Sequence, residues 1–199
     1  MPPALAPLVL ASASPRRAEL LAEAGLEFET SPAQLDESAL PGESPGQTCR
    51  RLAAAKAAAA QAGRSAGTLL GGDTLIEHEG RLLGKPLDER DAAAMLAALA
   101  GRRHRVWSAV ALLHVPTGLA VDGLEGADVE LLPLSAGWLP GYLESGEWRD
   151  KAGAYAIQGR AAAFTRLVDG ELDTVVGLPR RLLRELLARL AASVEGRAP

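Results

Sequence analysis

Apolar and polar positions in the first third of the chain predict one strand followed by two helices. The apolar run 8–11 predicts a short buried strand, after which Ser14 is expected to cap a helix over 15–25. A second helix should begin at 44–47, which matches a capping box, and end at Gly63. The chain is therefore expected to open with a strand, a tight turn and a helix.

The rest of the chain mixes hairpins with further helices. Short apolar runs bounded by Gly, Pro and Asp predict strands, and longer amphipathic stretches predict helices. The strands are expected over 68–77, 81–83, 106–115, 119–132, 164–168 and 172–176, and the helices over 88–99, over 135–143 and from Pro179 onward. This order predicts an α/β fold with a mixed sheet.

Nothing in the sequence divides the chain into independent domains. We find no internal repeat and no long low-complexity linker in the 199 residues, which suffice for one large hydrophobic core. We therefore expect a single two-lobed domain over 1–199. The ends 1–7 and 195–199 are expected to be frayed tails.

Composition narrows the class of protein. The net charge of −4 argues against a protein that coats nucleic acid without sequence specificity, because such binding needs many cationic contacts to phosphates. Cys49 is the single cysteine, which suits a reducing compartment. No secretion signal or membrane-spanning run is recognised. We expect a cytoplasmic protein that binds neither nucleic acid nor membrane.

The three lysines are candidate phosphate ligands. Of the 21 basic residues, 18 are arginines and only Lys56, Lys85 and Lys151 are lysines. A flexible ammonium differs physically from a planar guanidinium, so a chain that otherwise uses Arg can need Lys where it is kept. The competing interpretation is that the three lysines occur by chance on solvent-exposed faces and have no ligand-binding role.

Arg16 and Arg17 stand in the first turn of the first expected helix. Free backbone N–H groups and the positive end of the helix dipole favour an anion there, and two guanidinium groups would complete a phosphate clamp. The alternative is a pair of solvated arginines that face acidic residues on an amphipathic helix.

Two acidic positions are candidate metal ligands. Asp73 follows two glycines inside an apolar strand, where an unpaired carboxylate is costly, so it should meet a metal, a cation or strong donors. Asp36 and Glu37 lie in a loop, and a carboxylate from this pair would complete a magnesium site with Asp73. The alternatives are a turn cap for Asp73 and ordinary solvated charge for the pair.

Several common active sites are excluded because their motifs are missing. No phosphate-binding loop of the G-x-x-x-x-G-K-[ST] kind and no G-x-G-x-x-G after a strand is found. The three histidines, His78, His104 and His114, accompany no Ser or Cys motif, so we interpret them as structural. Another kind of phosphate-handling protein is required.

Five segments together resemble the Maf family of nucleotide pyrophosphatases, the septum-formation-inhibitor-like proteins. They are LASASPRRAELL at 10–21, GGDT at 71–74, LGKP at 83–86, DKAGAYAIQG at 150–159 and VGLP at 176–179. The resemblance covers nearly the whole chain. It implies an elongated mixed sheet with flanking helices in two lobes around a cleft, as in inosine triphosphate pyrophosphatases. Departures from the family pattern occur at Gly72, Ala156, Trp107 and Ser108.

The resemblance also implies an activity, site residues and a homodimer. The reaction would be hydrolysis of a nucleoside triphosphate, with Mg²⁺ or else Mn²⁺ or Co²⁺, to a monophosphate and pyrophosphate. Glu37 and Asp73 would be the metal and water-activating carboxylates, with Lys85 also catalytic. The remaining substrate ligands would be Ser12, Arg16, Arg17, Lys56, Thr74 and Gln158, of which Thr74 and Gln158 would read the base.

Residues at three positions favour dTTP and UTP as substrates. Arg16 would repel a cationic base such as 7-methylguanine, and the amide of Gln158 matches the N–H and carbonyl groups of thymine or uracil. Thr74 occupies the third position. Such an enzyme would also clear non-standard nucleotides. Two alternatives stay open: a 7-methyl-GTP pyrophosphatase and a non-catalytic, nucleotide-binding regulator of septum formation.

Overall fold

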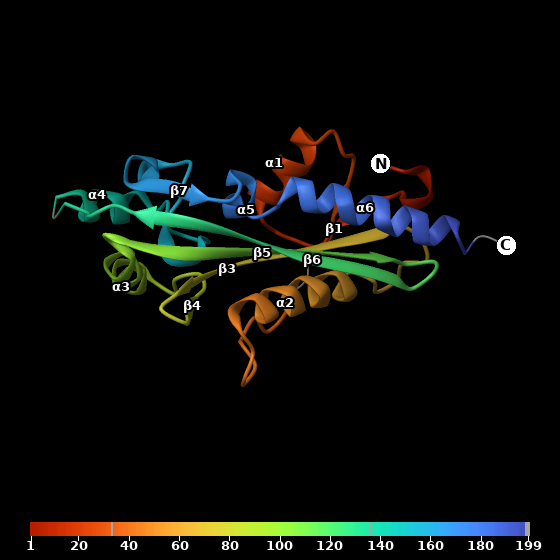
Figure 1. Cartoon of the computed structure of the whole chain (residues 1–199), viewed down its shortest axis with the longest axis horizontal. Helices are drawn as coiled ribbons and strands as arrows, with labels where there is room; N and C mark the ends of the chain where they lie inside the picture. The colour runs from red at the N-terminus through yellow and green to blue at the C-terminus, as the bar shows by residue number, and fades with distance from the viewer. Residues whose placement is uncertain (33, 136, 198–199) are drawn as a thin grey trace. The chain divides into compact units, whose positions relative to one another are not determined.

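The computed structural model describes residues 1–32, 34–135 and 137–197. It divides into two compact units. Unit 1 comprises Met1–Asp73, Ser108–Glu125 and Val176–Pro199, and unit 2 comprises Thr74–Trp107 and Gly126–Val175. Figure 1 shows the path of the chain through both units.

The strands of the described residues form a mixed sheet of seven strands, as the sequence predicts. Its spatial order is β2-β1-β3-β5-β6-β7, with β4 paired to β3. Strand β1 pairs in parallel with β2 and β3, whereas β3–β4 and β6–β7 are antiparallel pairs. The bounds are β1 Leu8–Leu10, β2 Glu29–Thr30, β3 Thr68–His78, β4 Arg81–Leu83, β5 Arg102–His114, β6 Leu119–Leu131 and β7 Thr165–Asp169.

Helices flank this sheet, and the N-termini of α1 and α2 show how capping residues determine where a helix begins. The helices are α1 Pro15–Glu23, α2 Pro45–Ala59, α3 Glu89–Leu99, α4 Trp138–Ser145, α5 Leu172–Val176 and α6 Arg180–Glu195, with 3₁₀ turns η1 Pro3–Leu5, η2 Ala152–Ala154 and η3 Arg160–Phe164. The capping box before α2 is confirmed, because Ser44 and Gln47 exchange both hydrogen bonds. Ser14 takes the N-cap position of α1, but its side chain makes no capping bond.

Two expected elements differ in the structure. The expected strand 172–176 is wrong, because these residues form the single-turn helix α5. At its start the Thr174 N–H donates to the carbonyl of Glu171, the residue before the helix, at 3.2 Å. Thr174 is fully buried and Val175 nearly so, and this burial overrides the β-propensity of their branched side chains. Helix α4 begins at Trp138, later than expected, and residue 136 of the expected helix lies outside the described residues.

The ends of the chain also differ from simple frayed tails. Near the N-terminus, η1 packs against α6, and Leu5 is completely buried. At the C-terminus α6 continues to Glu195, and the Arg197 N–H still donates to the Val194 carbonyl. Residues 198–199 of the expected tail lie outside the described residues. An apolar side chain such as Leu5 gains from burial even at the start of a chain.

Helix α2 lies on one face of the strands of unit 1, and α1 and α6 lie on the other (Figure 1). A Cβ atom at Gly71 of β3 would lie only 2.0 Å from the Ala53 carbonyl oxygen and 2.6 Å from the Ala57 nitrogen of α2. Helix and strand backbones are therefore in direct contact at this point. A Cβ atom at Gly123 of β6 would lie 2.6 Å from the end of the Leu182 side chain of α6, so α6 also packs closely on the strands here.

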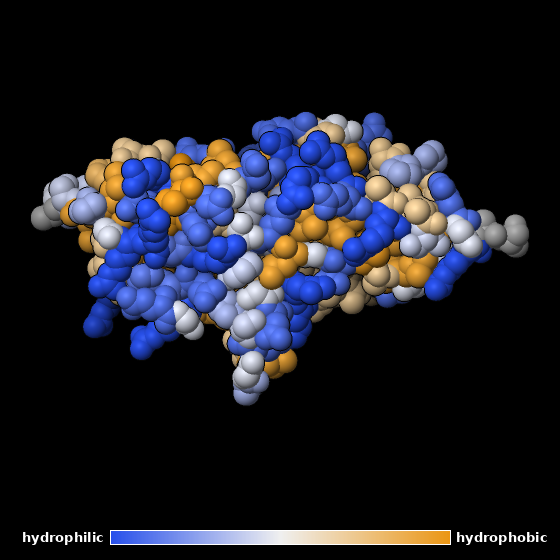
Figure 2. Space-filling model, viewed as in Figure 1, coloured by the Kyte–Doolittle hydropathy of each residue, from blue (hydrophilic) through white to orange (hydrophobic). Residues whose placement is uncertain are grey.

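Unit 2 has a hydrophobic core of its own. Leu96 and Leu99 of α3 are fully buried there with Val106 of β5 and Val129 of β6. Tyr142 stacks on Trp138 with ring centroids 4.6 Å apart. On the face drawn in Figure 2, hydrophilic residues cover most of the surface and apolar residues gather in a few patches. None of the described helices is long and apolar enough to cross a bilayer.

Candidate active site

Unit 1 contains a buried lysine that forms ion pairs with two carboxylates. The Lys56 Nζ is 2.6 Å from the Asp73 Oδ1 and 2.6 Å from the Glu37 Oε1. Lys56 is 6% exposed and Asp73 is 4% exposed, whereas the Glu37 side chain is 43% exposed. The prediction that Asp73 meets a cation is confirmed. Three of the residues singled out in the sequence therefore meet at one point.

The local sequence explains why Lys56 and Asp73 lie next to each other. Asp73 lies on β3 directly after Gly71 and Gly72, and the missing Cβ of Gly71 lets α2 approach the strand to backbone contact. Lys56 lies on α2 between Ala53 and Ala57, the residues that come closest to Gly71. From this position its ammonium group can donate to the Asp73 carboxylate. The glycine thus sets the distance between the lysine and the aspartate.

The charges of the cluster suit a hard divalent cation. Two carboxylates share one ammonium group, and the Asp73 Oδ2 is buried without a hydrogen-bond partner among the described residues. Mg²⁺ commonly binds through one or two carboxylates together with water and substrate phosphates. No group of three or more His, Cys, Asp or Glu side chains that would form a protein-only metal cage occurs in the described part of the chain. The residues present fit a magnesium ion that shares its coordination with substrate.

Arg17 is buried beside this cluster and is bound to protein groups. Its Nε donates to the Gly177 carbonyl at 2.9 Å, and its Nη1 donates to the Ser12 hydroxyl at 3.0 Å. Burial lowers the pKa of Arg17, while the charges of Asp73, Cys49 and Glu37 act in the opposite direction. The predicted ligands Ser12 and Arg17 are therefore brought together, next to the acidic cluster.

Arg16 and Arg17 occupy different environments on α1. Arg16 is half-buried, whereas Arg17 is buried and anchors the turn after β1. The Ser12 hydroxyl also accepts the Ser14 N–H at 3.2 Å, which orders the turn that leads into α1. Sequence reasoning missed the Gly177 carbonyl as the partner of Arg17. A segment more than a hundred residues away carries no local signal for such a bond.

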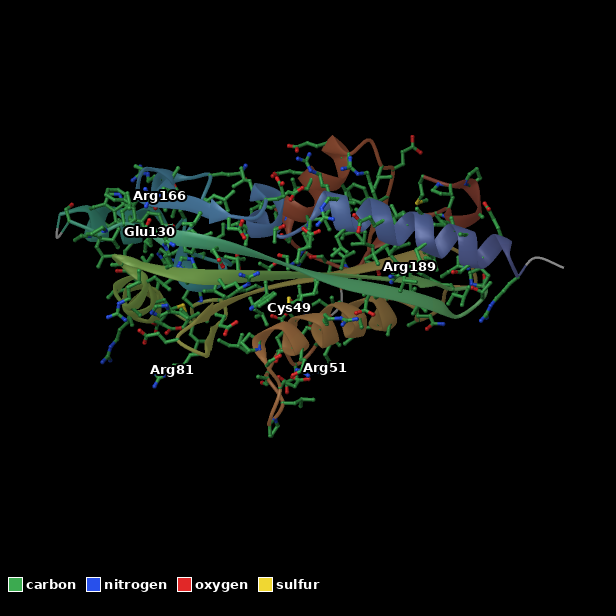
Figure 3. All side chains as sticks on the ribbon, in the orientation of Figure 1. Cys49, Arg51, Arg81, Glu130, Arg166 and Arg189 are labelled. Atoms are coloured by element: carbon green, nitrogen blue, oxygen red, sulfur yellow. The ribbon has the colours of Figure 1, made fainter. Side chains whose placement is uncertain are left out.

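Cys49 is a structural thiol and carries no chemistry. It lies on α2 (Figure 3) and is completely buried. Its Sγ donates to the Asp73 carbonyl oxygen at 3.4 Å. Burial, followed by the nearby charge of Asp73, raises the pKa of the thiol well above its ordinary value. The protonated thiol helps to hold α2 on β3, and it is not a nucleophile.

The other predicted ligands lie in unit 2. Thr74 follows Asp73 on β3 and is half-buried, Lys85 lies exposed in the loop after β4, and Gln158 lies exposed in the turn before η3. The Gly153 N–H donates to the Gly84 carbonyl at 3.0 Å, so the loop of Lys85 and the segment that leads to Gln158 are joined. The third lysine, Lys151, donates to the Arg149 carbonyl at 3.2 Å.

The segment that leads to Gln158 is anchored by buried polar contacts. The Tyr155 hydroxyl lies 2.7 Å from the His104 Nε2, and the Ala156 N–H donates to the Tyr142 hydroxyl at 3.1 Å. Burial lowers the pKa of His104 to about 4, so the imidazole is neutral near pH 7. His114 likewise contacts the Thr117 hydroxyl at 2.8 Å. These contacts agree with the interpretation of both histidines as structural.

The fold and the cluster define an α/β protein that buries a mixed-charge centre suited to phosphate and metal chemistry. Residues 7–190 match the family described as Maf-like protein. The chain belongs to the Maf family.

Relatives cover almost the whole chain. A protein of Moorella thermoacetica named dTTP/UTP pyrophosphatase is 45% identical over 192 residues, which are 96% of this chain and 98% of the relative. A protein of Symbiobacterium thermophilum with the same name is 41% identical over 92% of this chain and 93% of its own. A third, from Novosphingobium aromaticivorans, is 47% identical over 89% of this chain and 90% of its own and carries that name too.

Proposed function

We propose that this chain is a nucleoside triphosphate pyrophosphatase that hydrolyses dTTP and UTP to the monophosphate and pyrophosphate. The observation that carries the proposal is the similarity, over nearly the full length of each chain, to relatives named for this activity. The cluster of Lys56, Asp73 and Glu37 gives the activity a chemical basis. Such an enzyme is a hydrolase that acts on acid anhydrides.

In this proposal, cationic side chains receive the triphosphate. Arg16, Lys56 and Lys85 neutralise phosphate oxygens, because phosphoryl transfer depends mainly on positioning and charge stabilisation. Arg17 contributes its positive charge from its buried position and fixes the Ser12 hydroxyl nearby. We assign Ser12 to the same phosphate-binding group.

The two carboxylates have different proposed roles. Glu37 and Asp73 hold a divalent ion, Mg²⁺ or alternatively Mn²⁺ or Co²⁺, which supplies positive charge to the reacting phosphate when bound. Asp73, whose Oδ2 has no partner among the described residues, accepts a proton from the attacking water. Lys85 stabilises the charge that develops on the phosphate oxygens. No covalent enzyme intermediate is needed.

The reaction should release pyrophosphate by attack of water at the α phosphorus. Purified enzyme incubated with dTTP, Mg²⁺ and ¹⁸O-labelled water should form dTMP that carries the label, together with unlabelled pyrophosphate. Mass spectrometry of both products measures the position of the label. Thymidine diphosphate with orthophosphate as the main products, or label in the pyrophosphate, would contradict the proposed reaction.

The base should be read by Thr74 and Gln158, with dTTP and UTP turned over faster than 7-methyl-GTP. Gln158→Glu replaces an amide that donates and accepts with an anion that only accepts, so kcat/KM for dTTP should fall by about tenfold or more. Turnover of 7-methyl-GTP should fall less, since the new carboxylate attracts a cationic base. Wild-type enzyme that is fastest on 7-methyl-GTP would show the base assignment to be wrong.

Three further features belong to the proposal. We place the enzyme in the cytoplasm, where its substrates occur and where the single buried Cys49 stays reduced. We infer a homodimer from the family resemblance. The same activity would clear non-standard nucleotides, and turnover of such triphosphates by the purified enzyme tests this role.

A further inference from the structure

Glu37 is the exposed member of its cluster with Lys56 and Asp73, and its loop buries little of its side chain. Described residues of the segment 34–43 are exposed almost throughout, and Glu37 exposes 43% of its side chain. Lys56 and Asp73, in contrast, are held in a helix and a strand. An ion pair with one partner on an exposed loop contributes little unless the loop itself is ordered.

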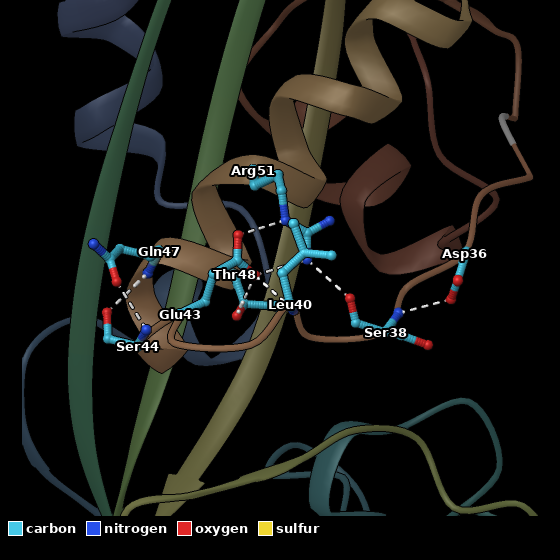
Figure 4. Close-up of polar contacts among 8 residues, drawn as sticks. All are labelled: Asp36, Ser38, Leu40, Glu43, Ser44, Gln47, Thr48 and Arg51. Carbon is cyan, nitrogen blue, oxygen red and sulfur yellow. Dashed lines mark hydrogen bonds and ion pairs between the residues drawn. The ribbon is translucent and has the colours of Figure 1, made fainter.

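Arg51 of α2 binds this loop at two places (Figure 4). Its Nε lies 2.6 Å from the Glu43 Oε1 and its Nη2 lies 2.8 Å from the Glu43 Oε2, a two-pronged contact. The same Nη2 donates to the Ser38 carbonyl at 2.9 Å. Ser38 follows Glu37 directly, so this bond fixes the backbone next to the carboxylate.

Glu43 makes further hydrogen bonds to the loop and to α2. One of its oxygens also accepts the Leu40 N–H at 3.1 Å and the Thr48 hydroxyl at 3.0 Å. The hydrogen bonds from Arg51 lower the pKa of Glu43 to about 2, so the carboxylate stays charged over the working pH range. Four hydrogen bonds thus join the loop to α2, and the bond from Leu40 adds a fifth within the loop.

We propose that Arg51 and Glu43 are positioning residues that hold the Glu37 carboxylate against Lys56 and Asp73. Arg51 and Lys56 lie on the same helix, so α2 presents the cation of the cluster and also fixes the loop that brings the second carboxylate to it. Neither Arg51 nor Glu43 needs to touch the nucleotide. The proposal deepens the proposed function, on which its kinetic part rests.

Arg50 provides a matched control on the same helix. Its Nε lies 2.6 Å from the Asp122 carboxylate of β6, so Arg50 and Arg51 are neighbours with equally short ion pairs to different elements. Arg51→Met should raise amide hydrogen exchange in the segment 36–43 severalfold, because the Ser38 and Glu43 anchors are lost. Arg50→Met should leave that segment unchanged. This measurement needs no substrate.

A double-mutant cycle tests whether Arg51 acts through Glu37. Arg51→Met should lower kcat for dTTP by about tenfold to a hundredfold with a smaller change in KM, as expected for a misplaced reacting group. In enzyme that already carries Glu37→Gln, the residual rate measured with radiolabelled dTTP should change less than about twofold on adding Arg51→Met. Arg51→Lys, which keeps the charge but not the two-pronged contact, should restore part of kcat.

Two results would overturn the proposal. One is that Arg51→Met lowers kcat by the same factor in wild-type enzyme and in the Glu37→Gln variant, which would indicate a general structural role. The other is unchanged hydrogen exchange in 36–43, which would show that Arg51 does not order the loop. A wild-type enzyme inactive on every nucleoside triphosphate would instead refute the proposed function, and the exchange measurement would still decide whether Arg51 holds the loop.

Discussion

Replacing Asp73 with asparagine should reduce pyrophosphate release by about a thousandfold or more while the protein stays folded. The amide keeps the size of the side chain and an oxygen that can accept from Lys56, but it loses the charge that would hold a metal and take a proton from water. Coupled detection of pyrophosphate from dTTP measures the effect. Near-normal turnover of the variant would remove Asp73 from the chemistry.

The matched control is Asp122→Asn, which removes a carboxylate from a second ion pair in unit 1. Asp122 lies 2.6 Å from Arg50, as Asp73 does from Lys56, but its side chain is 35% exposed. Exposed pairs of this kind contribute about 0–1 kcal/mol to stability. The control should therefore keep full activity and nearly the wild-type melting temperature. Comparable loss of activity in both variants would point to a general effect of removing charge.

Local sequence signals predicted most of the fold. The capping box at Ser44 and Gln47, the helix expected over 88–99 and the turn between β5 and β6 depend on neighbours in the chain, and all three occur in the structure. The expected strand 172–176 failed because Thr174 and Val175 are buried in a single helical turn. Branched side chains indicate strands only when local preference is not overridden by tertiary packing.

The sequence singled out residues that meet in the cluster, but it did not predict which of them contact one another. A carboxylate in an apolar strand must find a cation, so Asp73 could be singled out, and Lys56 is the cation it meets. The sequence could not show that Glu37 reaches the same ammonium group or that Arg17 binds Gly177. It also gave no sign of the contact between Arg51 and Glu43. Such pairings depend on how distant segments pack, which no spacing rule encodes.

Gly71 should be far less replaceable than its neighbour Gly72. A methyl group at position 71 would stand 2.0 Å from the backbone oxygen of Ala53, so β3 and α2 must separate. Overpacking a tight core commonly costs up to about 3 kcal/mol and sometimes more. Gly71→Ala should therefore lower the free energy of unfolding by about that amount. It should also reduce turnover strongly, because Lys56 and Asp73 move apart.

Gly72→Ala is the comparison that isolates this contact. A Cβ atom at position 72 would meet the Arg17 side chain first, at 3.2 Å from Nε, and would meet backbone only at 3.6 Å from the Ala109 oxygen. Alanine is also the residue of the Maf pattern at this place. Removing a flexible glycine from a strand stabilises by up to about 1 kcal/mol where space allows, which offsets the small shift required of Arg17. Chemical denaturation of both variants measures the difference. Equal stability of the two would show that the backbone contact between α2 and β3 does not set the geometry of the cluster.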